Sequence, residues 1–228
     1  MVTTTVTVKA NDLHAAFKSV LLFAGKDATL PMLAAVKLEI VGKELVAITT
    51  DRFRIGMVRV PIDTEVEFSD TFTTLINRTD VDNMVRVLAT AKKDVEWRAV
   101  TLTVEALVTG RNSVSYRTTD GTSGSVTALD ADFPKVRFLF PESAPELVDQ
   151  EADRHSFAVS PAYMGDFAKA ATILKARSMI IEPNVRADRP ATVRIGSNFY
   201  GLIMPVRVNG SDVDSYDARM AWKDVTGK

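Results

Sequence analysis

The sequence predicts an α+β fold in which antiparallel sheets and helices form a strand–helix–strands unit that occurs three times. Short segments alternate polar and apolar residues with a two-residue period, which is typical of strands with one buried face. Three longer segments place apolar residues three or four positions apart, which indicates amphipathic helices. Each helical segment follows a short strand at the same offset, and this regularity predicts the repeat.

The three predicted helices each present one apolar stripe. Thr79 is the expected N-cap of the second helix, while Ser160 and Pro161 are the expected N-cap and first helical residue of the third. The stripes cover residues 13–24, 81–89 and 164–174. Lys18, Arg86 and Lys169 lie off the stripes, so we expect them to face solvent.

The strands carry the repeat. Val8, Ile76 and Val159 each lie five residues before the first apolar residue of a helical stripe. Val41–Glu44 is the predicted hairpin turn between two alternating segments. Other alternating segments are Thr5–Val8, Val36–Ile40, Leu45–Thr49, Val58–Val60 and Thr101–Val104. In the alternative interpretation there is no repeat, and the three matched offsets arise by chance, because a strand followed by a helix is a common local order.

Composition excludes several classes of site. The chain has 228 residues, 28 Lys+Arg against 29 Asp+Glu, and no cysteine, which excludes a disulfide scaffold, a thiolate metal site and a cysteine nucleophile. With only two histidines, His14 and His155, we expect no metal and no cofactor. Neither a signal peptide nor a membrane-spanning run is evident, so we expect a soluble cytoplasmic protein that contacts no membrane.

Charge is unevenly distributed. The helical spans Asn11–Lys26, Arg78–Lys93 and Ser160–Arg177 hold nine bases and four acids, a net charge of +5, which leaves −6 on the rest of the chain. Such helices are either ordinary solvated surfaces or a basic face that follows the phosphates of a nucleic acid without reading its bases. Charge alone does not separate these two interpretations.

The predicted organisation is one large body, a connector, a smaller body and a tail. Pro141–Asp153 contains two prolines, five acids and no base, a composition typical of an exposed connector. The predicted parts are residues 1–141 with two units, the connector 142–154, residues 155–208 with one unit, and the tail 209–228.

Three stretches carry a family resemblance. The first is Leu30–Leu38 leading to Thr50–Ile55, the second is Asp132–Val136 followed by Leu139–Pro141, and the third is Tyr200–Val208. Together they resemble the bacterial DNA sliding clamp, the β subunit of DNA polymerase III. In that family a threonine–aspartate step followed by arginine closes a strand pair, a phenylalanine–proline motif ends a domain, and a methionine–proline–x–arginine strand ends the chain.

The resemblance implies a fold and a function. Each domain of the family pairs two units, with helices lining the inner face of a ring and sheets outside. Residues 1–141 resemble the middle domain and residues 155–208 the last half of the final one. Because the family carries six units and this chain shows three, the resemblance suggests a shortened form, and we expect it to be encoded by a phage or mobile element. It would be a non-enzymatic processivity factor, a homo-oligomer on duplex DNA that tethers a polymerase and meets a clamp loader.

The resemblance also implies two sets of site residues. A hydrophobic pocket between domains would bind short peptides of polymerases and repair proteins, with Arg52 where the family usually has glycine and Phe53 where it often has histidine. The matching pocket positions are Leu33, Thr50, Arg52, Phe53, Arg54, Ile55, Pro134, Leu139, Leu202 and Met204. The DNA-facing positions would be Lys18, Arg86, Lys92, Lys93, Lys169 and Lys175. In the alternative interpretation, the apolar pocket positions are interdomain core.

Two other functions stay open at this point. A clamp mimic would keep the pocket without encircling DNA, and a purely structural scaffold would bind neither peptide nor DNA. Catalysis is disfavoured because the sequence has no Gly-rich phosphate loop, no H-E-x-x-H and no G-x-S-x-G motif. Asp51, Asp130 and Asp132 lie where aspartate caps turns.

Overall fold

The computed structural model describes residues 3–63, 68–89, 96–106, 112–140, 158–184 and 189–206. The first unit is β1 (Thr3–Lys9), α1 (Ala10–Val20), η1 (Leu21–Phe23), β2 (Ala35–Gly42), β3 (Glu44–Thr50) and β4 (Arg54–Pro61). The second is β5 (Phe68–Asn77), α2 (Arg78–Leu88), β6 (Ala99–Ala106), β7 (Asn112–Thr118) and β8 (Ser123–Thr127), followed by η3 (Arg137–Leu139). The third comprises α3 (Pro161–Ile173), β9 (Met179–Glu182), β10 (Ala191–Ile195) and β11 (Phe199–Ile203).

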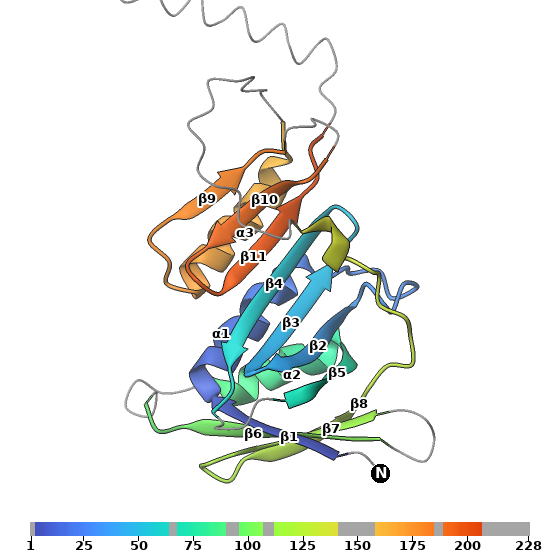
Figure 1. The fold of residues 1–228 in the computed structure, drawn as a ribbon, viewed down its shortest axis with the longest axis vertical. Coiled ribbons are helices and arrows are strands. Elements are labelled where there is room, and N and C mark those ends of the chain that lie inside the picture. The colour runs from blue at the N-terminus through green and yellow to red at the C-terminus, as the bar shows by residue number, and fades with distance from the viewer. Residues whose placement is uncertain are drawn as a thin grey trace, which may run out of the picture.

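The strands form two antiparallel sheets (Figure 1). The four-stranded sheet has the order β1-β6-β7-β8, and the seven-stranded sheet has the order β5-β2-β3-β4-β11-β10-β9. The first two units therefore exchange their first strands. The third unit joins the larger sheet through β4 and β11, where Ile55 lies opposite Leu202. The two predicted bodies are thus joined by one continuous sheet.

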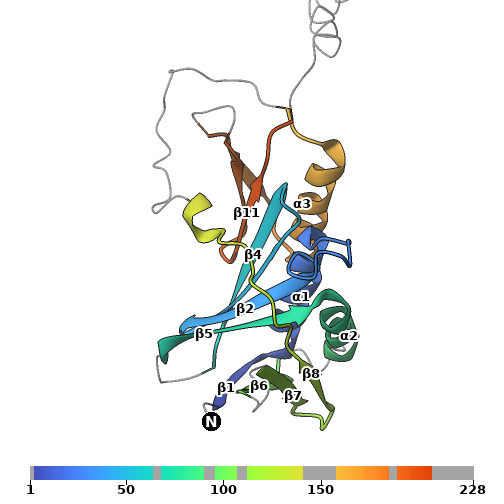
Figure 2. The same cartoon turned by 90° about the vertical axis from the view of Figure 1, so that its right-hand side faces the viewer.

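All three helices lie on the same side of the sheets, with α1 between α2 and α3 (Figure 2). The buried faces of α1 and α2, which include Leu13, Phe17 and Met84, form the main core with the sheets. The stripe of α3 is only partly buried: Phe167 and Ala170 join the core, whereas Ala168 is exposed. Phe23 reaches across to the third unit, with its ring centroid 4.6 Å from that of Phe167. None of the helices in the described ranges is long and apolar enough to cross a membrane.

The predicted α+β fold and its three helices are confirmed, with corrections at the ends of the helices. Asn77, not Thr79, caps α2, because its side-chain oxygen accepts a hydrogen bond of 2.8 Å from the Thr79 amide. Ser160 and Pro161 hold the predicted positions at the start of α3, although the Ser160 side chain makes no capping bond in this part of the structure. Before α3, the described residues contribute one bridge, Ala158 with Val206. The predicted connector and tail lie outside the described residues.

Candidate functional site: a pocket where two units meet

The turn between β3 and β4 is built by the Thr50–Asp51 step. The Thr50 hydroxyl donates to the Arg54 carbonyl at 2.8 Å and accepts from the Arg52 amide at 3.2 Å. One Asp51 carboxylate oxygen accepts from the amides of Phe53 and Arg54 at 3.0 and 2.8 Å. The turn places Arg52 at φ 80°, in the left-handed region where glycine is unstrained and other residues are not.

Arg54 connects this turn to the third unit. Its guanidinium donates to Asp51 at 2.7 Å and to Asp166 of α3 at 2.6 Å, and lies 4.2 Å from the ring centroid of Tyr163. The side chain is buried, so these partners offset the cost of removing its charge from water. Burial on its own would raise the pKa of Asp166, but hydrogen bonds from Arg54 and Lys169 prevail and lower that pKa below its ordinary value of 3.8.

A second apolar cluster lies on the face of the seven-stranded sheet that points away from the helices, at β3, β4 and β11. We call it the outer cluster. Its buried members are Val46, Ile48, Ile55, Met57, Val136 and Leu202, and Phe133, Leu139, Phe140 and Tyr200 pack against them. Segment 133–140 thus lies across β3, β4 and β11. It is held by Arg137, which pairs with the buried carboxylate of Glu39 on β2.

The pocket opens at one end of the outer cluster, across the boundary between the first and third units. It has a volume of about 150 Å³, and its described lining consists of Arg52, Phe53, Arg54, Ile55, Leu139, Arg189, Pro190, Leu202 and Met204. An apolar cavity of roughly this volume accepts a ring the size of benzene. The site therefore offers an anchor point for one apolar or aromatic side chain.

Seven of the ten predicted pocket residues line this cavity. Of the other three, Leu33 packs against Gly25, Thr50 holds the turn, and Pro134 lies in segment 133–140 but not at the cavity. Arg189 and Pro190 were missed. Because Ala191 pairs with Ile203, Pro190 falls beside Met204, and the register of the β10–β11 hairpin is the signal that identifies them.

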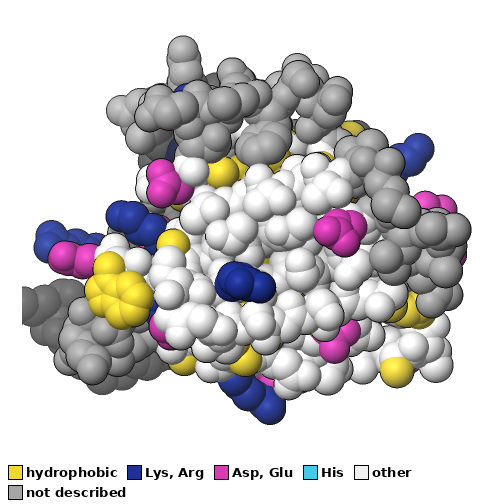
Figure 3. All heavy atoms as spheres, turned by 90° about the horizontal axis from the view of Figure 1, so that it is seen from below, with side chains coloured by type: hydrophobic (Ala, Val, Ile, Leu, Met, Phe, Trp, Pro, Cys, Tyr) yellow, Lys and Arg dark blue, Asp and Glu magenta, His cyan; other side chains and the backbone are white. Residues whose placement is uncertain are grey.

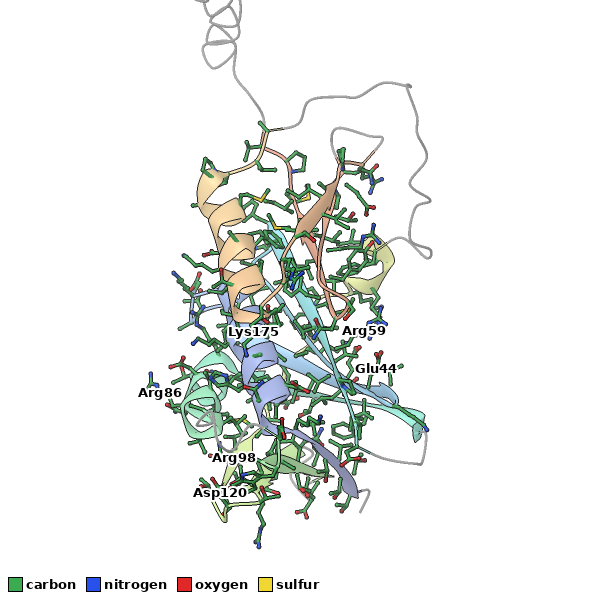
Figure 4. All side chains as sticks on the ribbon, turned by 90° about the vertical axis from the view of Figure 1, so that its left-hand side faces the viewer. Glu44, Arg59, Arg86, Arg98, Asp120 and Lys175 are labelled. Atoms are coloured by element: carbon green, nitrogen blue, oxygen red, sulfur yellow. The ribbon has the colours of Figure 1, made fainter. Side chains whose placement is uncertain are left out.

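The helical side of the molecule carries the other predicted set. Lys18 and Lys175 are exposed and line one cavity of about 330 Å³ between α1 and the end of α3, together with His14 and Asn198. Arg86 and Lys169 are exposed too, but pair with Asp82 and Asp166 of their own helices at 2.6 and 2.9 Å. Figure 4 shows Arg86 on the side of the helices and Arg59 with Glu44 on the opposite side. Lys92 and Lys93 lie outside the described residues.

His14 adds a titratable group to this surface. Burial and, to a smaller extent, the positive charge of Lys18 lower the pKa of His14 below its ordinary value of 6.5. This shift favours the neutral ring, so Lys18 and Lys175 supply the positive charge of the cavity, which the acidic residue Asp12 also lines. Among the residues described, no group of three or more His, Cys, Asp or Glu side chains is arranged to hold a metal ion.

Comparison with known proteins points to one family. The family model described as "DNA polymerase III beta subunit, central domain" matches residues 7–135. The curated beta sliding clamp of Micrococcus luteus is 34% identical over 133 residues, a match that covers 57% of this chain and 38% of that protein. The sequence relation thus spans less than half of that relative.

Solved sliding clamps share the fold. The clamp of Bacillus subtilis aligns with a TM-score of 0.69 at 15% identity, covering 90% of this chain and 65% of the clamp. The clamp of Pseudomonas aeruginosa gives 0.69 at 13% identity with coverages of 90% and 66%, and the beta subunit of Thermotoga maritima gives 0.63 at 17% with the same coverages. The chain spans about two thirds of each.

Proposed function

Since the chain belongs to the DNA polymerase III beta subunit family, whose central-domain model spans more than half of it, we propose that it acts as a sliding-clamp-like processivity factor. The family is one of non-enzymatic clamps. In this proposal the helical side rests on duplex DNA, and the pocket tethers a polymerase by a short peptide. Tethering raises the effective concentration of the polymerase at the primer end without new catalytic chemistry.

The pocket carries the proposal. Its walls come from the turn after β3, from segment 133–140 and from the β10–β11 hairpin, so it exists only where the first and third units are joined. Leu139, Leu202 and Met204 offer an adaptable apolar surface, which suits leucine and aromatic anchors of a peptide.

Peptide binding is the direct test. We expect a labelled peptide with leucine and phenylalanine anchors to bind, and Leu139→Ala or Met204→Ala to weaken binding about ten-fold, because each removes a wall of the cavity. Thr103→Ala, on the other sheet, is the control and should leave affinity unchanged. If neither pocket variant changes the affinity, the peptide site lies elsewhere.

DNA contact is supported by Lys18 and Lys175, which share a cavity and make no ion pair among the described residues. We expect Lys18→Gln with Lys175→Gln to reduce the salt dependence of duplex binding by about two phosphate contacts. Arg59→Gln, on the sheet side, should not change it (Figure 4). An unchanged salt dependence in the double variant would remove these two lysines from the DNA surface.

Assembly and loading belong to the same proposal. If twelve units are needed to surround a duplex, as the family resemblance implies, four chains of three units would supply them. Light scattering checks this, since a stable monomer at micromolar concentration contradicts a closed homo-oligomer. Peptide binding with no gain in polymerase processivity would instead favour a clamp mimic. A clamp loader is the further partner that a closed ring requires.

A further inference from the structure

The pocket combines an apolar floor with two cationic side chains at its edge. Arg52 and Arg189 line the cavity and are exposed, whereas Phe53, Ile55 and Leu202 supply apolar surface. None of the described lining residues is acidic. A ligand that fills the apolar part would therefore bring its neighbouring groups next to positive charge.

The third arginine of the pocket differs from these two. The Arg54 guanidinium already donates to Asp51, Asp166 and the Leu22 carbonyl. Its charge is balanced within the protein, and its role is to join the turn to α3. Arg54 therefore holds the pocket together and is not available to a ligand.

Arg52 and Arg189 make no ion pair within the described parts of the chain. Asp27 is close enough for the Arg52 charge to contribute to its lowered pKa, but only as the smallest cause, after two hydrogen bonds from Thr29 and an opposing effect of burial. The Asp27 carboxylate accepts those bonds at 2.6 and 2.9 Å. Asp27 thus leaves the Arg52 guanidinium free for a ligand.

The backbone at Arg52 strengthens the argument. Its φ of 80° is a conformation that glycine adopts without strain and that costs other residues about 1–2 kcal/mol. A strained residue at the edge of a binding pocket suggests that its side chain is used. Among the described residues, none forms a hydrogen bond or an ion pair with the Arg52 guanidinium. The side chain is therefore available to a ligand.

The geometry points to an acidic peptide as the partner of this pocket: one apolar or aromatic anchor enters the cavity while an adjacent aspartate or glutamate pairs with Arg52 and Arg189. This inference rests on the proposed function, because it assigns the chemistry of the peptide bound at the same site. Arginine suits the role because its planar guanidinium donates two parallel hydrogen bonds to a carboxylate.

The test uses two labelled peptides that share leucine and phenylalanine anchors and differ only in an aspartate or asparagine beside the leucine. We expect the full chain to bind the aspartate peptide about five- to ten-fold more tightly, with the ratio falling as sodium chloride rises from roughly 50 to 500 mM. Arg52→Gln with Arg189→Gln should reduce the ratio to about one, because the aspartate peptide loses more affinity than the asparagine peptide.

Two further variants serve as controls. Arg59→Gln removes an equal charge from the same face of β4, four residues beyond Ile55, and should preserve the ratio. Arg52→Gly removes the charge while relieving the backbone, so its reduced ratio is not due to misfolding. Equal affinities for both peptides in the unaltered chain, or an unchanged ratio in the double variant, overturn the inference but leave the peptide pocket intact. Failure of both peptides to bind overturns the pocket and the inference together.

Discussion

The four strands of the smaller sheet, β1-β6-β7-β8, are arranged like the strands β5-β2-β3-β4 of the larger sheet. The outer faces of the two sheets nevertheless differ. On the four-stranded sheet, Thr5, Thr103, Ser115 and Ser125 lie side by side across the strands. The molecule viewed from that end shows mostly uncharged polar side chains and backbone (Figure 3). On the seven-stranded sheet, β3 and β4 contribute four outward apolar residues, Val46, Ile48, Ile55 and Met57, which are buried and pack with segment 133–140.

This contrast indicates which sheet of a repeated fold can carry a pocket. An antiparallel sheet with hydroxyls outside is satisfied by water and needs no cover. An apolar outer face must be covered, and a short covering segment leaves a gap at its end. The pocket is that gap, so the outward side chains, and not the backbone repeat, select the sheet that carries it.

The largest expected effect comes from removing Arg54, which links the turn after β3 to α3 of the third unit. Arg54→Ala removes the partner shared by Asp51 and Asp166, and we expect a loss of about 3 kcal/mol in the free energy of unfolding. Urea denaturation measures it. Arg86→Ala, which breaks an exposed pair on α2, should cost less than about 1 kcal/mol. Equal losses in the two variants would show that Arg54 does not join the units.

The outer faces themselves can be compared by matched truncations on equivalent strands. Ile48 on β3 is 1% exposed, whereas Ser115 on β7 is half-buried on the hydroxyl face. We expect Ile48→Ala to cost about 2 kcal/mol and Ser115→Ala less than about 0.5 kcal/mol, both from urea denaturation. A loss at Ser115 as large as that at Ile48 would contradict the contrast between the faces.

Acid should weaken the cover of the apolar face. Burial would raise the pKa of Glu39, but bonds from Lys37 and Arg137 prevail and lower it below its ordinary value of 4.5. The ion pairs therefore stabilise the fold fully above that value and lose this effect as the pH falls through the lower folded-state pKa. We expect Glu39→Gln to be less stable than the unaltered chain at neutral pH, with the difference disappearing as the pH falls below 4.5 and through the lower folded-state pKa. A gap independent of pH contradicts this role.

The smallest effect concerns the strained turn beside the pocket. Arg52→Gly relieves the left-handed conformation but adds freedom to the unfolded chain, so we expect stabilisation of less than about 1 kcal/mol. Thermal unfolding measures the shift. Arg59→Gly is a suitable contrast, because a residue within β4 has ordinary strand geometry and should lose stability. Destabilisation at Arg52 would mean that its side chain contributes more than its backbone costs.

The sequence predicted what depends on local patterns. The helices could be predicted because their apolar residues recur at helical spacing. The seven predicted residues that line the cavity were carried over from three short motifs with a family resemblance. The exchange of β1 and β5 between units and the pairing of β4 with β11 were not found, because they join segments far apart in the chain. Arg54 was predicted as a pocket residue, but its pairing with Asp166, 112 residues away, could not be identified without the fold.

The continuous sheet between the first and third units has a thermodynamic consequence. Because the pocket draws its walls from both units, the proposed ligand would bind only while β4 and β11 remain paired. A bound peptide would therefore stabilise this junction, and at a hundred times its dissociation constant it would raise the free energy of separating the units by about 2.7 kcal/mol. Conversely, any change that weakens the pairing of β4 with β11 would lower the apparent affinity of the pocket. Ligand binding and local unfolding at this junction are therefore thermodynamically coupled.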